Sequence, residues 1–279
     1  MKNFLETPHH INASPADLAG NNGIGRYILL PGSDGRARTI ADNFNNLLIK
    51  EHPRGHHLYT GSLDDNGLKV DVAVISSGMG CPSMEIILHE LFHLGGKRFL
   101  RVGTAGSLQK KQIKIGDIVS AQASVRDEST TLDYAPLSIP AISSIEMMGA
   151  IQLAANINNM RDLLHTGIVH CKNSFYAREF YAGPKASENK AYMELLIANG
   201  VLASEMETAA LFIQSQLYHH QLMQKGSGPD FKVIWGAILG IGAVPPDEYM
   251  TEAQEKPLTD NIIKLALSTI KILAASERS

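Results

Sequence analysis

Short apolar runs alternate along the chain with longer segments in which apolar residues recur at helical spacing. The short runs are rich in β-branched residues and several end at a glycine, which is typical of strands buried on both faces of a sheet. They predict strands at 26–32, 70–78, 98–104, 117–125, 166–171 and 232–240. The longer segments predict helices at 34–50, 82–95, 142–160, 187–199, 205–220 and 251–276.

This alternation predicts an α/β fold in which helices cover both faces of a central sheet. The chain contains no internal repeat, and 224–231, "QKGSGPDF", has the composition of a surface loop rather than of a linker between domains. We therefore expect residues 1–279 to form a single domain. In open α/β sheets, ligands bind beyond the carboxyl ends of the strands, so the residues that follow each strand are the first candidates for chemistry.

Composition and charge exclude several classes of protein. The chain is 44% hydrophobic and carries a formal net charge of −3, which favours a large buried core and gives no reason to expect a nucleic-acid or membrane partner. Cys81 and Cys171 are too few and too far apart in sequence for a disulfide framework. The N-terminal "MKNFLETPHHINASPADL" has no apolar run typical of a signal peptide. We expect a cytoplasmic protein.

Glycine-rich segments follow the first two predicted strands. In "PGSDGRAR" (31–38), Gly32 allows the backbone to approach a ligand and Arg36 follows within reach of the same place. The segment lacks the Gly-Lys-Ser/Thr of a P-loop and the spacing of a dinucleotide motif. In "SSGMGCPS" (76–83), a glycine-rich turn leads into a helix whose amino end can bind an anion. Plain turns and a solvated arginine are the alternative.

The third strand contains a charged residue among apolar neighbours. In "FLRVGTAGSLQ" (99–109), Arg101 would be costly to bury without an anion, which is either a ligand or an internal carboxylate. Two arginines and two glycine-rich turns at neighbouring strand ends indicate an oxyanion such as phosphate.

A pair of acidic residues lies where a short apolar segment turns into a helix. In "ASEMETAALF" (203–212), Glu205 and Glu207 flank Met206. A carboxylate at this place can accept hydrogen bonds from two hydroxyl groups, as a sugar diol offers them. Capping of the helix amino end is the alternative for either residue.

The segment "HELFHLGG" (89–96) has the His-Glu-x-x-His spacing of a zinc protease helix. A short motif of this kind also arises by chance, and Phe99 stands where one protease class has a further histidine. Apolar residues recur through the segment at helical spacing, namely Met84, Ile87, Leu88, Leu91 and Leu94. We therefore interpret it as a scaffold helix, with a zinc protease as the remote alternative.

Taken together, the motifs resemble the nucleoside phosphorylase family, and within it most closely the uridine phosphorylases. The segments "LPGSDGRARTIA", "SSGMGCPSMEI", "FLRVGTAGSLQ" and "EMETAAL" occur in the family's order and spacing, and the resemblance runs from about His10 to Ile272. It implies a three-layer α/β/α domain with a mixed central sheet. It also implies homodimers, or hexamers built as trimers of dimers, in which subunits share active sites.

The resemblance further implies the roles of individual residues. The phosphate site would consist of Gly32, Arg36, Arg101 and Thr104, together with Arg54 of a neighbouring subunit. The ribose would contact Met206, Glu207 and a neighbour's His10. The base would contact Phe175 and Arg178. The catalytic groups would be Arg101, Thr104 and Glu207, with inorganic phosphate as co-substrate and no metal or other cofactor.

Two segments depart from the family pattern. In "FYAREFYAGP" (175–184) the glutamine expected to contact uracil is missing, so Arg178 is either the pyrimidine-binding residue or a solvent-facing arginine. In "AILGIGAVPPDEY" (237–249) neither the carboxylate of purine enzymes nor the arginine of pyrimidine enzymes follows Gly240. We expect phosphorolysis of a pyrimidine nucleoside, most simply uridine. A purine nucleoside phosphorylase, a nucleosidase that uses water and a non-catalytic nucleoside sensor remain alternatives.

Overall fold

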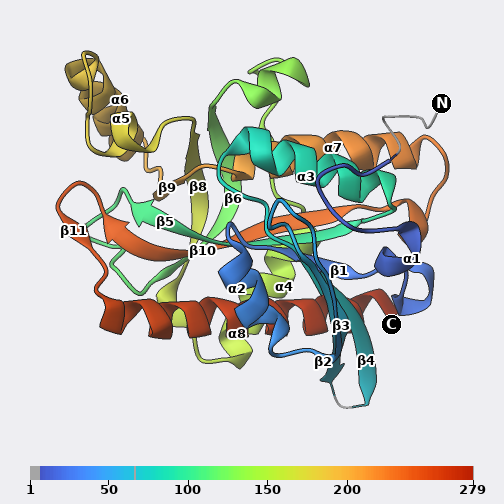
Figure 1. Ribbon diagram of the computed structural model, residues 1–279. Coiled ribbons are helices and arrows are strands. Elements are labelled where there is room, and N and C mark those ends of the chain that lie inside the picture. The colour runs from blue at the N-terminus through green and yellow to red at the C-terminus, as the bar shows by residue number, and fades with distance from the viewer. Residues whose placement is uncertain (1–6, 66, 279) are drawn as a thin grey trace.

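The computed structural model describes residues 7–65 and 67–278, whose strands form one 11-stranded mixed sheet (Figure 1). The strands are β1 (Tyr27–Leu30), β2 (Asn45–Lys50), β3 (Leu58–Asp65), β4 (Leu68–Val74), β5 (Arg98–Ser107), β6 (Ile118–Asp127), β7 (Ala141–Ile142), β8 (Leu164–Lys172), β9 (Ala203–Glu205), β10 (Ile234–Val244) and β11 (Glu248–Tyr249). Their order is β11-β10-β6-β8-β9-β5-β1-β4-β3-β2, with β7 paired to β6 and a further pairing of β10 with β5.

Helices cover both faces of this sheet. They are α1 (Pro15–Leu18), α2 (Asp34–Ala41), α3 (Cys81–His93), α4 (Ile145–Ile157), α5 (Phe175–Glu179), α6 (Ala186–Ala198), α7 (Thr208–Met223) and α8 (Glu252–Arg278). In Figure 1, α3 and α7 lie on one side of the sheet, and α2, α4 and α8 lie on the other. The predicted three-layer α/β/α architecture with a mixed central sheet is confirmed.

The strands are apolar on both sides because each side has its own core. In β1, Tyr27 and Leu29 belong to the core shared with α2, α4 and α8, whereas Ile28 and Leu30 belong to the core shared with α3 and α7. This alternation follows from the two-residue period of a strand. It explains why the strands appear in the sequence as continuous apolar runs.

One predicted element is wrong. The helix expected over 34–50 ends at Ala41, and the edge strand β2 follows it and pairs with β3. Leu48 and Ile49, which lie within the range predicted as a helix, are 68% and 46% exposed on this edge. Because the pairing joins residues that are 8 to 17 positions apart along the chain, from Lys50↔Leu58 to Asn45↔Ser62, local spacing could not distinguish the strand from a longer helix. The strand β3 itself was not predicted.

The other predicted helices and all six predicted strands are present with shifted ends. For example, the helix expected over 205–220 runs from Thr208 to Met223, and the short strand β9 precedes it. In the part of the chain that the structure describes, no helix is both long enough and apolar enough to cross a membrane.

Candidate active site

A cavity of about 290 Å³ lies where β1 and β4 end and where β5 meets the antiparallel strand β9. Seven of the predicted site residues line it, namely Gly32, Arg36, Arg101, Thr104, Phe175, Met206 and Glu207. A larger hollow of about 780 Å³ borders α4, α8 and the amino end of β10, but no arginine is among the described residues that line it. The fold therefore brings most of the predicted site together from segments far apart in the sequence.

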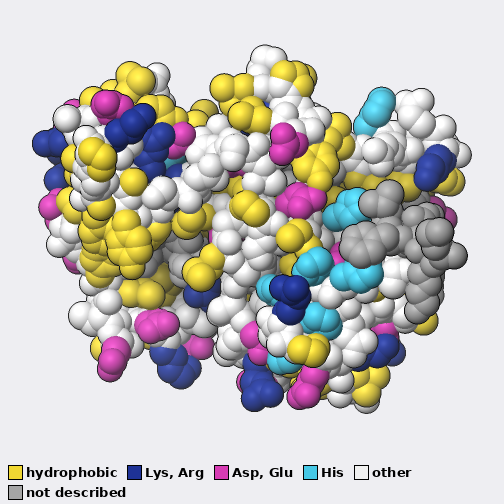
Figure 2. Space-filling view, turned by 45° about the horizontal axis from the view of Figure 1, so that its top comes forward, with side chains coloured by type: hydrophobic (Ala, Val, Ile, Leu, Met, Phe, Trp, Pro, Cys, Tyr) yellow, Lys and Arg dark blue, Asp and Glu magenta, His cyan; other side chains and the backbone are white. Residues whose placement is uncertain are grey.

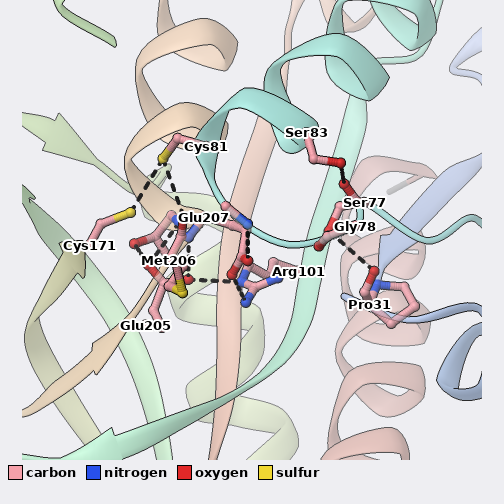
Figure 3. A network of polar contacts seen from close by, with 12 residues as sticks. Pro31, Ser77, Gly78, Cys81, Ser83, Arg101, Cys171, Glu205, Met206 and Glu207 are labelled. Carbon is pink, nitrogen blue, oxygen red and sulfur yellow. Dashed lines mark hydrogen bonds and ion pairs between the residues drawn. The ribbon is translucent and has the colours of Figure 1, made fainter. Parts of the chain in front are cut away.

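Arg101 lies at the centre of the charged network in this cavity (Figure 3). Its guanidinium donates from Nε to Glu205 Oε2 at 3.0 Å and from Nη2 to Glu207 Oε2. Its Nη1 atom is buried and finds no hydrogen-bond partner among the described residues. A buried donor without an acceptor is costly. The site thus offers an unused donor to an oxyanion.

The two acidic residues have different roles. Glu205 Oε1 accepts a hydrogen bond from the backbone N–H of Thr208 at 2.9 Å, so this carboxylate caps the amino end of α7 as well as pairing with Arg101. Burial by itself raises the pKa of Glu205, but Arg101 and the bonds from Thr208 outweigh it and hold that pKa below its usual value. The capping alternative considered for Glu205 therefore holds, and Glu205 is also an internal carboxylate of the kind considered as a partner for Arg101.

Glu207 lines the cavity and is held from two sides. Its Oε1 atom accepts a hydrogen bond from the backbone N–H of Gly80 at 2.6 Å, and its Oε2 atom accepts from Arg101. Burial raises the pKa of Glu207, Arg101 opposes the shift, and the neighbouring carboxylate of Glu205 adds to it, so the pKa lies above its usual value. A carboxylate with this setting is available to accept hydrogen bonds from ligand hydroxyl groups.

Arg36 reaches the cavity from the first turn of α2, where Ser33 Oγ accepts a hydrogen bond from its backbone N–H at 3.4 Å. Burial, followed by the positive charge of Arg101, lowers the pKa of Arg36. No ion pair of Arg36 is found among the described residues. Two guanidinium groups that repel one another in a cavity create a strong field for a polyanion.

The loop between β4 and α3 forms the wall beside these arginines (Figure 3). Ser77 donates from its backbone N–H to the carbonyl of Pro31 at 2.8 Å, and Ser83 Oγ donates to the carbonyl of Ser77 at 2.7 Å. Gly78 and Gly80 have φ angles of +73° and +84°, a conformation that favours glycine. The loop is therefore fixed against the end of β1, with the Gly80 N–H directed at Glu207.

The predicted residues His10 and Arg54 do not line the cavity of this chain. His10 Nδ1 lies 2.7 Å from Glu90 Oε1, and Arg54 is exposed in the turn after β2. Burial lowers the pKa of His56, and the nearby side chains of His52, His10 and Arg54 lower it further. These residues share one surface, on which histidine side chains gather around a basic residue (Figure 2).

Arg178, the predicted base-binding residue, also lies outside the lining of the cavity. Its guanidinium binds Asp127 at 2.7 Å and Asn189 at 2.8 Å, and it lies over the ring of Tyr192 at 4.3 Å. These contacts occupy the group in fixing α5 against β6 and α6. Sequence reasoning could not anticipate them, because the partners come from two other elements, β6 and α6.

Two charged residues in the cavity were missed. Lys172 and Glu179 line it beside Phe175. A usable signal existed for Lys172, since it directly follows the apolar run predicted as a strand at 166–171 and thus stands at a strand end.

The His-Glu-x-x-His segment forms part of α3, as the scaffold interpretation predicts. Glu90 accepts hydrogen bonds from the backbone N–H groups of His9 and Ile11 at 2.8 and 3.1 Å, as well as from His10. Its carboxylate thereby anchors the segment before α1 and is not directed at a metal. Among the described residues, no group of three or more His, Cys, Asp or Glu side chains is arranged to hold a metal ion.

A three-layer fold with paired arginines and a buried carboxylate pair at its strand ends defines an enzyme of the phosphorylase type. The chain belongs to the Phosphorylase superfamily, whose sequence profile matches residues 26–224. The predicted family and enzyme class are confirmed.

Individual relatives are similar along much of the chain. A uridine phosphorylase of Treponema pallidum (strain Nichols) is 33% identical over 271 residues, which cover 96% of this chain and 95% of the relative. A uridine phosphorylase of Escherichia coli (strain K12) is 32% identical over 72% of this chain and 77% of the relative. A DeoD-type purine nucleoside phosphorylase of Streptococcus suis (strain 05ZYH33) is 31% identical over 94% of this chain and 98% of the relative.

Proposed function

We propose that this protein catalyses the phosphate-dependent cleavage of a nucleoside, and of uridine in particular. The observation that supports the proposal most directly is the convergence of Arg36 and Arg101 on one cavity, with the buried Nη1 of Arg101 lacking a partner among the described residues. A hydrolase that activates water has no need for two guanidinium groups there. The uridine phosphorylases among the relatives support the choice of substrate.

In this proposal the protein supplies position and charge rather than a nucleophile. Arg36, Arg101 and the hydroxyl of Thr104 hold phosphate next to the anomeric carbon, and Glu207 accepts hydrogen bonds from the ribose hydroxyls. The C1′–N bond breaks with its electron pair moving to the base, and a phosphate oxygen forms the new C1′–O bond. The cationic character that develops on the sugar is stabilised by the adjacent phosphate and by the carboxylate.

We further propose that the active site is completed by a second copy of the chain. His10 and Arg54 lie on a shared surface away from their own cavity, as residues that serve a neighbour's cavity would. A mixture of Glu207→Gln and Arg54→Met chains tests this. If the site is shared, the mixed dimer contains one site made only of wild-type groups, so activity rises on mixing; additive residual rates would contradict sharing.

The reaction is tested by measuring base release with and without inorganic phosphate. We expect release from uridine to depend on phosphate and to yield a pentose 1-phosphate. Inosine, adenosine and cytidine belong in the same panel, because one of the relatives that is similar along nearly the whole chain is a purine nucleoside phosphorylase. Equal rates with and without phosphate would indicate a nucleosidase, and binding without release of any base would indicate a sensor.

A further inference from the structure

A buried ion pair lines the same cavity as the two arginines. The Nζ atom of Lys172, whose side chain is 1% exposed, lies 2.6 Å from Glu179 Oε1 and 3.0 Å from Ser204 Oγ. It also lies 5.6 Å from the ring centroid of Phe175. An ammonium group has three N–H donors. The two contacts leave one of them for a ligand in the cavity.

The order of strands separates this lysine from Arg36. Lys172 ends β8, and β9 and β5 lie between β8 and β1, the strand that leads to Arg36. Arg101 and Glu207 come from the intervening region. Arg36 and Lys172 therefore lie toward opposite ends of this row of strands, with Arg101 and Glu207 between them. A molecule with phosphate at the arginines and ribose at Glu207 places its base toward Lys172.

The surroundings of Lys172 suit a flat ring. Phe175 and Tyr249 line the same part of the cavity, and hydrophobic side chains gather on the side of the molecule where α5 and β11 lie (Figure 2). Tyr249 stacks on Phe180 with a centroid separation of 5.7 Å. Aromatic faces are favourable partners for a planar base.

A chain of hydrogen bonds through Ser204 and His170 to Asp127 holds the ammonium group in position. Ser204 Oγ contacts both Lys172 Nζ and His170 Nδ1 at 3.0 Å, and His170 Nε2 lies 2.9 Å from Asp127 Oδ2. A buried ion pair is weak support for stability, because an apolar pair of similar volume is often at least as stable. We therefore attribute the buried, restrained ammonium group at the cavity wall to contact with a ligand.

Resting on the function proposed above, we propose that Lys172 binds the departing base and stabilises the negative charge that develops on it, with Glu179 as its positioning residue. When the C1′–N bond breaks, its electron pair moves onto the base and spreads to the ring carbonyl oxygens. The ammonium group donates a hydrogen bond to one such oxygen and stays protonated. The base anion takes a proton from water on release. Among the described residues that line the cavity, Lys172 is the only cation besides Arg36 and Arg101.

The test compares leaving groups of different quality. Single-turnover rates are measured for uridine and 5-fluorouridine, whose base is the better leaving group, in wild-type protein, Lys172→Met and Lys172→Arg. Removing one donor to a developing anion costs about 10²–10³-fold in rate. We expect Lys172→Met to lose about this much on uridine and at least several-fold less on 5-fluorouridine. The ratio of the 5-fluorouridine rate to the uridine rate should therefore rise. Lys172→Arg should restore most of the loss.

The controls distinguish this role from a structural one. Lys190→Met, an exposed lysine on α6, should change neither rate. A Lys172→Met protein that keeps the wild-type ratio, whatever its overall loss, would overturn the proposal. If that variant does not fold, Glu179→Gln gives the same readout, with a raised ratio expected and an unchanged ratio contradicting the role. Failure of wild-type protein to release any base with phosphate would instead refute the proposed function.

Discussion

Replacing Arg36 by methionine should separate phosphate binding from stability. Arg36 has no ion pair among the described residues, and its pKa is lowered by burial and by the charge of Arg101. Its removal therefore leaves no carboxylate stranded and relieves a repulsion. In contrast, Arg101→Met leaves Glu205 and Glu207 buried without their cation. The two arginines contact the same cavity but contribute to stability in opposite ways.

The expected magnitudes follow from these contacts. A hydrogen bond to a charged group contributes about 1.5–3 kcal/mol, so the loss of one or two such bonds to phosphate should lower kcat/KM for phosphate by about 10²-fold. We expect the free energy of unfolding of Arg36→Met to stay within about 0.5 kcal/mol of wild type or to rise. Arg101→Met should lose about 3–5 kcal/mol, because breaking a buried pair leaves uncompensated charges.

The assay combines initial rates at varied phosphate with thermal unfolding in phosphate-free buffer, because a bound ligand stabilises the folded state. Added phosphate should raise the Tm of wild-type protein and leave that of Arg36→Met nearly unchanged. The matched control is Arg161→Met, because Arg161 is exposed and does not line the cavity. The reasoning is refuted if Arg36→Met keeps the wild-type KM for phosphate, or if it loses as much stability as Arg101→Met.

Three further predictions concern the support of the site. In Gly103→Ala the new Cβ would lie 2.8 Å from Arg101 Nη2, so the guanidinium must shift. We expect turnover to fall about tenfold or more. An unchanged rate would contradict the tight placement of Arg101. Glu205→Gln should be less stable than wild type by about 3–5 kcal/mol in urea unfolding, because Arg101 loses the carboxylate that also caps α7. A mild effect would show that Glu207 alone suffices as the partner of Arg101. Burial raises the pKa of Glu90, but hydrogen bonds from His9 and His10 outweigh burial and hold this pKa below its ordinary value of 4.5. The contribution of Glu90 to stability is therefore present above about pH 4.5 and is lost as the pH falls through the lowered pKa. We expect wild-type protein to have a higher Tm than Glu90→Gln at pH 6 and the same Tm in acid; a difference that does not change with pH would argue against anchoring by the ionised carboxylate.

Most of the candidate site could be predicted because its residues stand next to strands with a strong local signal. Gly32 and Arg36 follow one apolar run, Arg101 interrupts another, and Glu207 stands where a third becomes a helix. Since an α/β sheet places such positions at the same edge, the order of motifs along the chain was sufficient to group them.

Sequence reasoning could not assign the partners of side chains whose contacts come from distant segments. Arg178 is predicted from the sequence to contact the base, but Asp127 and Asn189 bind its guanidinium. Glu90 stood in a metal-binding spacing, but the backbone of the segment before α1 takes up its carboxylate. In both cases the side chain has the type that the motif requires, but groups from another element hydrogen-bond to it.

The sequence by itself determined the layered α/β architecture, the scaffold role of α3 and the arginine end of the cavity, because these depend on periodicity and on the residues that follow each strand. Only the tertiary structure decided that 45–50 is an edge strand, that Glu205 caps a helix, and that Lys172 and Glu179 line the same cavity as Glu207. The physical reason is that burial, charge pairing and strand pairing are properties of contacts between segments, and local sequence specifies a segment's own shape more strongly than its partners.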